Sequence, residues 1–124
     1  MCGIFGVVSP ARGVDIGLLK RASESLEHRG PDGFGYLLCN PQMTSVVYNS
    51  SDLPEGRCDV ALTNRRLAII DLPGGNQPMA NEDESVWCTF NGEIYNFLEL
   101  RAELEAEGVQ FKSHTDTEVI LYLI

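Results

Sequence analysis

Residues 1–10, MCGIFGVVSP, place a cysteine directly before a short apolar run. The run at residues 3–8, GIFGVV, predicts a buried β-strand, because it is brief and apolar and is followed by the turn-forming sequence SPARG. Cys2 is either incidental or a nucleophile that the chemistry needs at the end of the chain. Met-Cys alone favours the incidental interpretation. Removal of Met1, however, would give the thiol a free α-amino group of pKa about 7.7–8.0, which is a base near neutral pH.

Composition narrows the class of protein. The 124 residues carry 18 acidic and 9 basic side chains, for a net charge of −9, and the length suits one domain. Such acidity argues against nucleic acid or an anionic membrane as partner, since both attract basic surfaces. No apolar run reaches the roughly 20 residues that span a bilayer, and no signal-peptide pattern is evident. We therefore expect a cytoplasmic protein that uses neither membrane nor nucleic acid.

The cysteines do not form a metal-binding or disulfide pattern. They lie at positions 2, 39, 58 and 88, and the histidines are His28 and His114. Because no CxxC pair occurs, we expect no metal site. In a chain of this size without secretory signals, reduced thiols are expected rather than disulfides.

Apolar periodicity predicts three helices. The first spans residues 15–27 and has Asp15 as its N-cap. The second, NFLELRAELEAEG, is the clearest: Asn96 caps its start and Gly108 stops it. The third begins in TDTEVILYLI, where Thr and Glu three residues apart have the spacing of a capping box. That box would pair Thr115 with Glu118, and the apolar residues after it are expected to leave an exposed strip.

Short apolar runs predict the strands. Besides residues 3–8, they lie at 34–39, 45–49, 59–63, 67–71 and 86–90. Because these runs do not alternate strictly with the helices, the pattern favours an α+β fold over a parallel α/β sheet.

Three polar motifs could carry chemistry. In FNGEIYN, the amide of Asn91 beside the unshielded N–H of Gly92 could form an oxyanion hole, although Asn-Gly is also a hairpin turn. In NRRLAIID, one of Arg65 and Arg66 should face inward and need an anion, either a ligand carboxylate or an acidic side chain. HRGPDG, residues 28–33, is equally consistent with a helix C-terminus.

Taken together, these motifs resemble a known family. MCGIFGVV, HRGPDG, RRLAIIDLPGGNQPM, NGEIYNFLELRAEL and SHTDTEVIL resemble the class II glutamine amidotransferase domain, in particular that of glutamine-hydrolysing asparagine synthetases. The resemblance covers essentially the whole chain. It implies an N-terminal nucleophile hydrolase fold, a four-layer αββα sandwich with two antiparallel sheets, incomplete here at its C-terminal end.

The resemblance also implies residue roles. Cys2 would be the nucleophile once Met1 is removed, and it would form a glutamyl thioester. The side chain of Asn91 and the backbone N–H of Gly92 would form the oxyanion hole.

Substrate-binding roles are implied in the same way. Arg66 would bind the α-carboxylate of L-glutamine, while Glu93 and Asp116 would hold its α-amino group. Arg29 and Gly30 would lie in the loop beside the nucleophile. Glutamine is a zwitterion, so a site with one fixed cation and at least one carboxylate suits it.

The resemblance finally implies a larger enzyme of the asparagine synthase type. Residues 1–124 would be the N-terminal portion of the amidotransferase domain and would need no cofactor. An ATP- and Mg²⁺-dependent synthetase domain outside the chain would use the ammonia to amidate aspartate, and the full-length protein could be a homodimer. Alternatives are a relative with another ammonia acceptor, or a truncated glutamine-binding module without activity.

Two details qualify the match. Asn64 stands where the family usually has histidine, and we assign it no chemical role. The loop LPGGNQP, residues 72–78, lacks the lysine and the Ser/Thr of a phosphate-binding loop, and we interpret it as a wall of the glutamine pocket.

Overall fold

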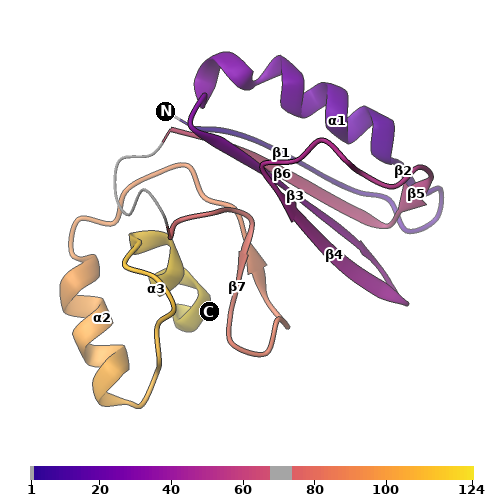
Figure 1. The fold of residues 1–124 in the computed structure, drawn as a ribbon. Helices are drawn as coiled ribbons and strands as arrows, with labels where there is room; N and C mark the ends of the chain where they lie inside the picture. The colour runs from indigo at the N-terminus through magenta and orange to yellow at the C-terminus, as the bar shows by residue number, and fades with distance from the viewer. Residues whose placement is uncertain (1, 68–73) are drawn as a thin grey trace.

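The computed structural model describes residues 2–67 and 74–124, which form an α+β fold with antiparallel sheets (Figure 1). The main sheet has the strand order β1 (Gly3–Val8), β6 (Val60–Arg66), β3 (Gly33–Asn40) and β4 (Met43–Tyr48). Shorter ribbons pair β2 (Val14–Asp15) with β5 (Arg57–Cys58) and β7 (Met79–Ala80) with β8 (Trp87–Cys88). The helices are α1 (Ile16–Ser25), the 3-10 turn η1 (Glu27–Arg29), α2 (Phe97–Ala106) and α3 (Asp116–Leu123).

Most predicted strands are confirmed. The run at residues 3–8 is β1 with the expected bounds. The strand predicted at 67–71 is not found at Leu67, because β6 ends at Arg66, and residues 68–71 lie outside the described part of the chain. Four further runs are confirmed with ends shifted by one to three residues, namely those predicted at 34–39, 45–49, 59–63 and 86–90.

Helix α1 covers one face of the main sheet (Figure 1). The side chains of Leu19, Tyr36 and Ala61 meet in this layer, and each has 0% of its surface exposed. The predicted N-cap is confirmed, because the Asp15 carboxylate accepts a hydrogen bond from the N–H of Leu18 at 3.2 Å. This layer is the apolar core against which the sheet is built.

The opposite face of the sheet carries the chain that leads into β7. Gly35 of β3 lies so close to this segment that a Cβ atom there would sit 2.0 Å from the carbonyl oxygen of Gln77. Tyr48, the register partner of Gly35, donates its hydroxyl to the carbonyl of Pro78 at 2.5 Å. The absence of a side chain at Gly35 therefore allows residues 77–78 to lie directly on the sheet. Beyond them, α3 packs against β7 and β8.

The ends of α2 are partly as predicted. Gly108 follows the helix with φ of 101°, and its N–H donates to the carbonyl of Glu105 at 3.1 Å, as expected for a left-handed residue that stops a helix. Asn96 occupies the N-cap position, but its side chain makes no capping hydrogen bond within the described chain.

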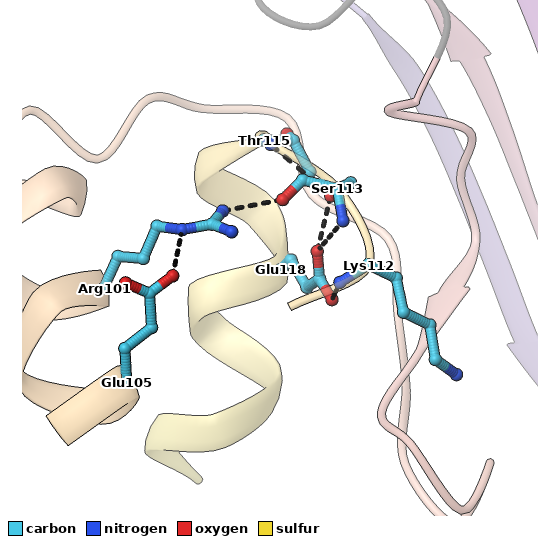
Figure 2. A network of polar contacts seen from close by, with 6 residues as sticks. All are labelled: Arg101, Glu105, Lys112, Ser113, Thr115 and Glu118. Carbon is cyan, nitrogen blue, oxygen red and sulfur yellow. Dashed lines mark hydrogen bonds and ion pairs between the residues drawn. The ribbon is translucent and has the colours of Figure 1, made fainter. Parts of the chain in front are cut away.

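The capping box predicted for α3 is wrong in its second half. The hydroxyl of Thr115 accepts the N–H of Thr117 at 3.4 Å, as a cap should. The Glu118 carboxylate instead accepts the N–H groups of Lys112 and Ser113, each at 2.8 Å, and the Ser113 hydroxyl at 2.5 Å (Figure 2). Because Glu118 is only 2% exposed, these donors replace the water that its charge has lost.

Arg101 of α2 forms a hydrogen bond to the loop that directly precedes α3. Its Nη1 donates to the carbonyl of Ser113 at 2.6 Å and its Nε to the carboxylate of Glu105 at 2.9 Å (Figure 2). The guanidinium also lies 4.3 Å from the centroid of the Phe111 ring. The loop before α3 is thus held from both helices, which fixes where α3 begins.

The apolar strip expected after Glu118 is smaller than predicted. Val119 and Leu121 are buried, whereas Leu123 and Ile124 are exposed. None of the helices in the described part of the chain has the length and apolar character needed to cross a membrane.

Gly35→Ala tests the contact between residues 77–78 and the sheet. We expect the free energy of unfolding to fall by about 3 kcal/mol, because backbone atoms of Gln77 cannot yield to the new methyl group. Gly6→Ala is the matched control, since its Cβ would meet only the movable end of Leu62. Urea unfolding of both variants measures the difference, and equal losses would contradict the interpretation.

Glu118→Gln tests the carboxylate under α3. An amide group keeps one acceptor but turns N–H donors toward other donors, so we expect a loss of about 1–3 kcal/mol in unfolding free energy. The exposed Glu103, in the middle of α2, provides the control Glu103→Gln, which should change stability by less than about 0.5 kcal/mol. Thermal or urea unfolding would refute the role if the two variants behaved alike.

Candidate active site

A cavity of about 340 Å³ opens between the end of the main sheet and the N-terminus of α3. Its size falls within the range of small-molecule sites. The wall is built from segments that are far apart in the sequence: Cys2, residues 66–67, residues 75 and 77, the 90–95 segment and residues 115–117.

The thiol of Cys2 is placed by the pairing of β1 with β6. Gly3 pairs with Arg65, so Cys2, one residue earlier, lies beside Arg66, one residue later. The N–H of Leu67 donates to Sγ of Cys2 at 3.3 Å, and Sγ donates to the carbonyl of Leu67 at 3.6 Å. The pairing of the two strands and the backbone of Leu67 thus fix where the thiol lies on the cavity wall.

The other cysteines are differently placed. All four are free thiols, and Cys2 is the one that lines the cavity among the described residues. Burial raises the pKa of the Cys58 thiol and that of the Cys88 thiol above the ordinary value. Those two groups therefore stay protonated and are poor nucleophiles at neutral pH.

The prediction that one of the two arginines faces inward is wrong, because both are buried on opposite faces of a sheet that is covered on both sides. Arg65 points to the α1 layer, where Nε donates to the carbonyl of Ser23 at 3.1 Å and to its hydroxyl at 3.0 Å. Arg66 lines the cavity. Gly75 makes room for it, since a Cβ there would lie 2.4 Å from Nη2 of Arg66.

The predicted oxyanion residues lie in a loop rather than a hairpin. Asn91 and Gly92 are exposed on the cavity wall, and the next element along the chain is α2 instead of a returning strand. The loop is held at both ends through its backbone. Phe90 N–H donates to Oε1 of Gln77 at 2.7 Å, and Ile94 N–H donates to Oδ2 of Asp116 at 2.8 Å.

Two acidic groups share the cavity with the arginine. Asp116 is 5% exposed, and its Oδ1 accepts the hydroxyl of Thr115 at 3.3 Å. Glu93 is exposed on the wall. The cavity therefore combines a thiol, a guanidinium and two carboxylates, which is the charge pattern that an amino acid zwitterion requires.

Arg29 and Gly30 do not line the cavity. A Cβ at Gly30 would lie 2.3 Å from the carbonyl oxygen of Arg65, and a Cβ at Gly3 would lie 3.3 Å from the Cβ of Arg29. Both residues therefore pack behind the β1–β6 pair, next to the strand that carries Cys2. Their role in substrate binding stays a prediction.

The side chain of Gln77 is a site feature that the sequence did not single out. Its only signal was its place in the loop LPGGNQP, interpreted as a pocket wall. Gly75 and Gln77 do line the cavity, while residues 72–73 lie outside the described part of the chain. Asn64 supports Gln77, because its buried Nδ2 donates to Oε1 of Gln77 at 3.1 Å and to the Thr89 hydroxyl at 2.9 Å.

A metal centre is not evident in this part of the molecule. Among the described residues, no group of three or more His, Cys, Asp or Glu side chains could hold a metal ion.

The chain is similar to proteins from distant organisms. It is 41% identical over 125 residues to the glutamine-hydrolyzing asparagine synthetase 1 of Bacillus subtilis (strain 168), covering 98% of this chain and 17% of that protein. A probable glutamine-hydrolyzing asparagine synthetase of Dictyostelium discoideum is 42% identical over 127 residues, with coverage of 99% and 19%. A putative one of Methanocaldococcus jannaschii is 36% identical over 129 residues, with coverage of 99% and 23%.

The chain thus spans between 17% and 23% of the length of these three relatives. Residues 1–124 also match, from end to end, the family described as the glutamine amidotransferase domain. Because this match covers the whole of residues 1–124, the chain belongs to the glutamine amidotransferase domain family.

Proposed function

We propose that the chain hydrolyses the side-chain amide of L-glutamine, as the glutaminase portion of an asparagine synthetase-like enzyme. One observation carries the proposal: a single cavity is lined by Cys2, Arg66, the Asn91–Gly92 pair and Asp116. These residues come from the two ends of the sequence and from its middle, so their convergence is a property of the fold.

Binding of the substrate follows from the charges of the wall. The α-carboxylate of glutamine would pair with Arg66, whose planar guanidinium can donate two parallel hydrogen bonds. The α-amino group would pair with Glu93 and with the carboxylate of Asp116, whose Oδ1 also accepts from the Thr115 hydroxyl and whose Oδ2 accepts from Ile94 N–H. With the α-carboxylate and the α-amino group both held, the side-chain amide at the other end of glutamine would extend toward the thiol.

In the first chemical step the α-amino group of Cys2 takes the proton of the thiol, and the resulting thiolate attacks the amide carbonyl. The C–S bond forms as the carbonyl oxygen takes up negative charge. The amide of Asn91 and the N–H of Gly92 would donate to this oxyanion, which is the interaction that lowers the barrier most in acyl transfer. Leu67 N–H donates to Sγ at 3.3 Å and helps to hold the sulfur in position for attack.

The intermediate then collapses and is hydrolysed. The C–N bond breaks, ammonia leaves with a proton supplied by the α-amino group of Cys2, and a glutamyl thioester remains. Water adds to the thioester, assisted by the same amine, and glutamate and the free thiol are released. Glutamine and water enter, and glutamate and ammonia leave.

The fate of the ammonia belongs to a part of the enzyme outside this chain. We propose that a synthetase portion uses ATP and Mg²⁺ to activate aspartate, which ammonia then converts to asparagine. Residues 74–77, Gly-Gly-Asn-Gln, carry neither the lysine nor the Ser/Thr of a phosphate-binding loop. These four residues therefore do not fit the phosphates of ATP.

We also propose that the complete domain is a four-layer αββα sandwich. In support, α1 lies on one face of the main sheet, while the β7–β8 ribbon and then α3 follow on the other (Figure 1). The ribbon would be the first part of the second antiparallel sheet.

Cys2→Ser tests the nucleophile. We expect nearly all glutaminase turnover to be lost, because a serine hydroxyl ionises far less than a thiol at neutral pH. Release of glutamate from glutamine measures turnover, and Cys39→Ser, outside the cavity, is the control. Undiminished turnover in Cys2→Ser would contradict the mechanism.

The active protein should lack Met1, which a measurement of its intact mass can check. Full activity with Met1 retained would exclude the terminal amine as the base.

Asn91→Ala and Arg66→Ala should separate chemistry from binding. Loss of one oxyanion donor should lower kcat by about 10²–10³-fold. Loss of the guanidinium should mainly raise KM, provided that chemistry is slower than substrate release. Asn96→Ala, in the same stretch but outside the cavity lining, is the control for steady-state kinetics. If Asn91→Ala changed KM alone, Asn91 would be a turn former and not an oxyanion donor.

A further inference from the structure

The loop that carries Asn91 and Gly92 is held at its two ends by hydrogen bonds to the side chains of Gln77 and Asp116. We propose that one of these, Gln77, is a positioning residue that sets the oxyanion donors in place. The proposal rests on the glutaminase function proposed above, because it assigns a role within that same site.

Both polar atoms of the Gln77 side-chain amide form hydrogen bonds. Its Oε1 accepts from Phe90 N–H at 2.7 Å, from Nδ2 of Asn64 at 3.1 Å and from the Thr89 hydroxyl at 3.3 Å. Its Nε2 donates to the Thr117 hydroxyl at 3.2 Å. The short bond to Phe90 matters most, because Phe90 directly precedes Asn91 and its amide fixes the direction in which the loop leaves β8.

The far end of the loop is tied to α3. Ile94 N–H donates to Asp116 at 2.8 Å, and Asp116 is followed by Thr117, which accepts from Gln77. A closed ring therefore runs from Gln77 through the loop to α3 and back. Within this ring, the three residues 91–93 are free to face the cavity while both flanking amides are bound.

Gln77 can hold the loop because it is itself held. Its side chain is 8% exposed, so its amide has little access to water and depends on these partners. Its backbone lies against Gly35 of the sheet, and the next residue, Pro78, accepts the Tyr48 hydroxyl. Asn64 supports the side chain from β6, although its own Oδ1 is buried without a hydrogen-bond partner among the described residues.

Such a support acts on rate more than on affinity. Arg66 and Asp116 would still bind the α-carboxylate and the α-amino group of glutamine if the Gln77 side chain were lost. The hydrogen bond to Oδ1 of Asp116 comes from the Thr115 hydroxyl and not from Gln77. The donors of residues 91–92 would lose their fixed position relative to the developing oxyanion. A misplacement of about 1 Å at a reacting centre can cost on the order of 100-fold in rate.

Gln77→Met in the full natural protein is the test, because methionine keeps the length of the side chain and removes its hydrogen bonds. We expect kcat for glutamine hydrolysis to fall by about 10- to 100-fold. The dissociation constant of glutamine, measured by calorimetry in the Cys2→Ala background, should change by less than about threefold. Gln110→Met, at an exposed glutamine, should leave both values unchanged.

A double-variant comparison separates positioning from general loosening of the fold. If Gln77 acts through the loop, Asn91→Ala should cost much less in the Gln77→Met background than in the wild type, because the donor is already misplaced. Independent, multiplicative effects would overturn the proposal. So would an affinity loss as large as the loss in kcat.

Thr117→Val is a second variant that tests the same hydrogen bond if the Gln77 variant fails to fold. It removes the hydroxyl that accepts Nε2 of Gln77 while keeping the shape of the side chain. We expect a smaller fall in kcat, about 3- to 10-fold, again with glutamine affinity retained. Unchanged kcat would overturn the ring as a support. If the wild type itself hydrolysed no glutamine, the proposed function would fail, whereas an active wild type with fully active variants would refute this inference alone.

Discussion

The site depends on the close approach of two backbones, at Gly35 in β3 and at Gln77 in the chain that crosses it. No side chain separates them, since a Cβ at Gly35 would lie 2.0 Å from the Gln77 carbonyl oxygen. The crossing segment therefore lies on the sheet, and the Gln77 side chain reaches β6, the 90–94 loop and α3 at once. Elements that are remote in sequence are therefore held in fixed positions relative to one another by contacts to the same side chain.

β6 carries the second constraint, because it is central in the main sheet and contributes to both faces. Its alternation sends Arg65 to the α1 layer and Arg66 to the cavity. The same strand sets the register that brings Cys2 beside Arg66. A shift of one residue in the β1–β6 pairing would move the thiol away from the cation, so the pairing of the sheet and the proposed chemistry depend on one register.

Local signals predicted local structure well. The Asp15 cap, the left-handed Gly108 and the strand at residues 3–8 depend on neighbours in sequence, and the structure has all three. The family motifs likewise indicated which residues would meet, though from resemblance and not from spacing. Arg29 and Gly30, expected in the loop beside the nucleophile, pack against the strands that carry Cys2 and Arg66 but do not line the cavity, and their role in substrate binding stays a prediction.

The capping box failed because the partners of its glutamate cannot be found from spacing. Glu118 has the capping-box spacing to Thr115, but the N–H groups of Lys112 and Ser113 compete for its carboxylate because the preceding loop folds back over the helix.

Gln77 was not singled out beyond its place in the loop LPGGNQP for the same reason, since a glutamine before proline indicates only a turn until its four partners are known. Buried polar side chains with several distant partners are therefore the part of an active site that sequence periodicity describes least. They are also the part that decides how firmly the reacting groups are held.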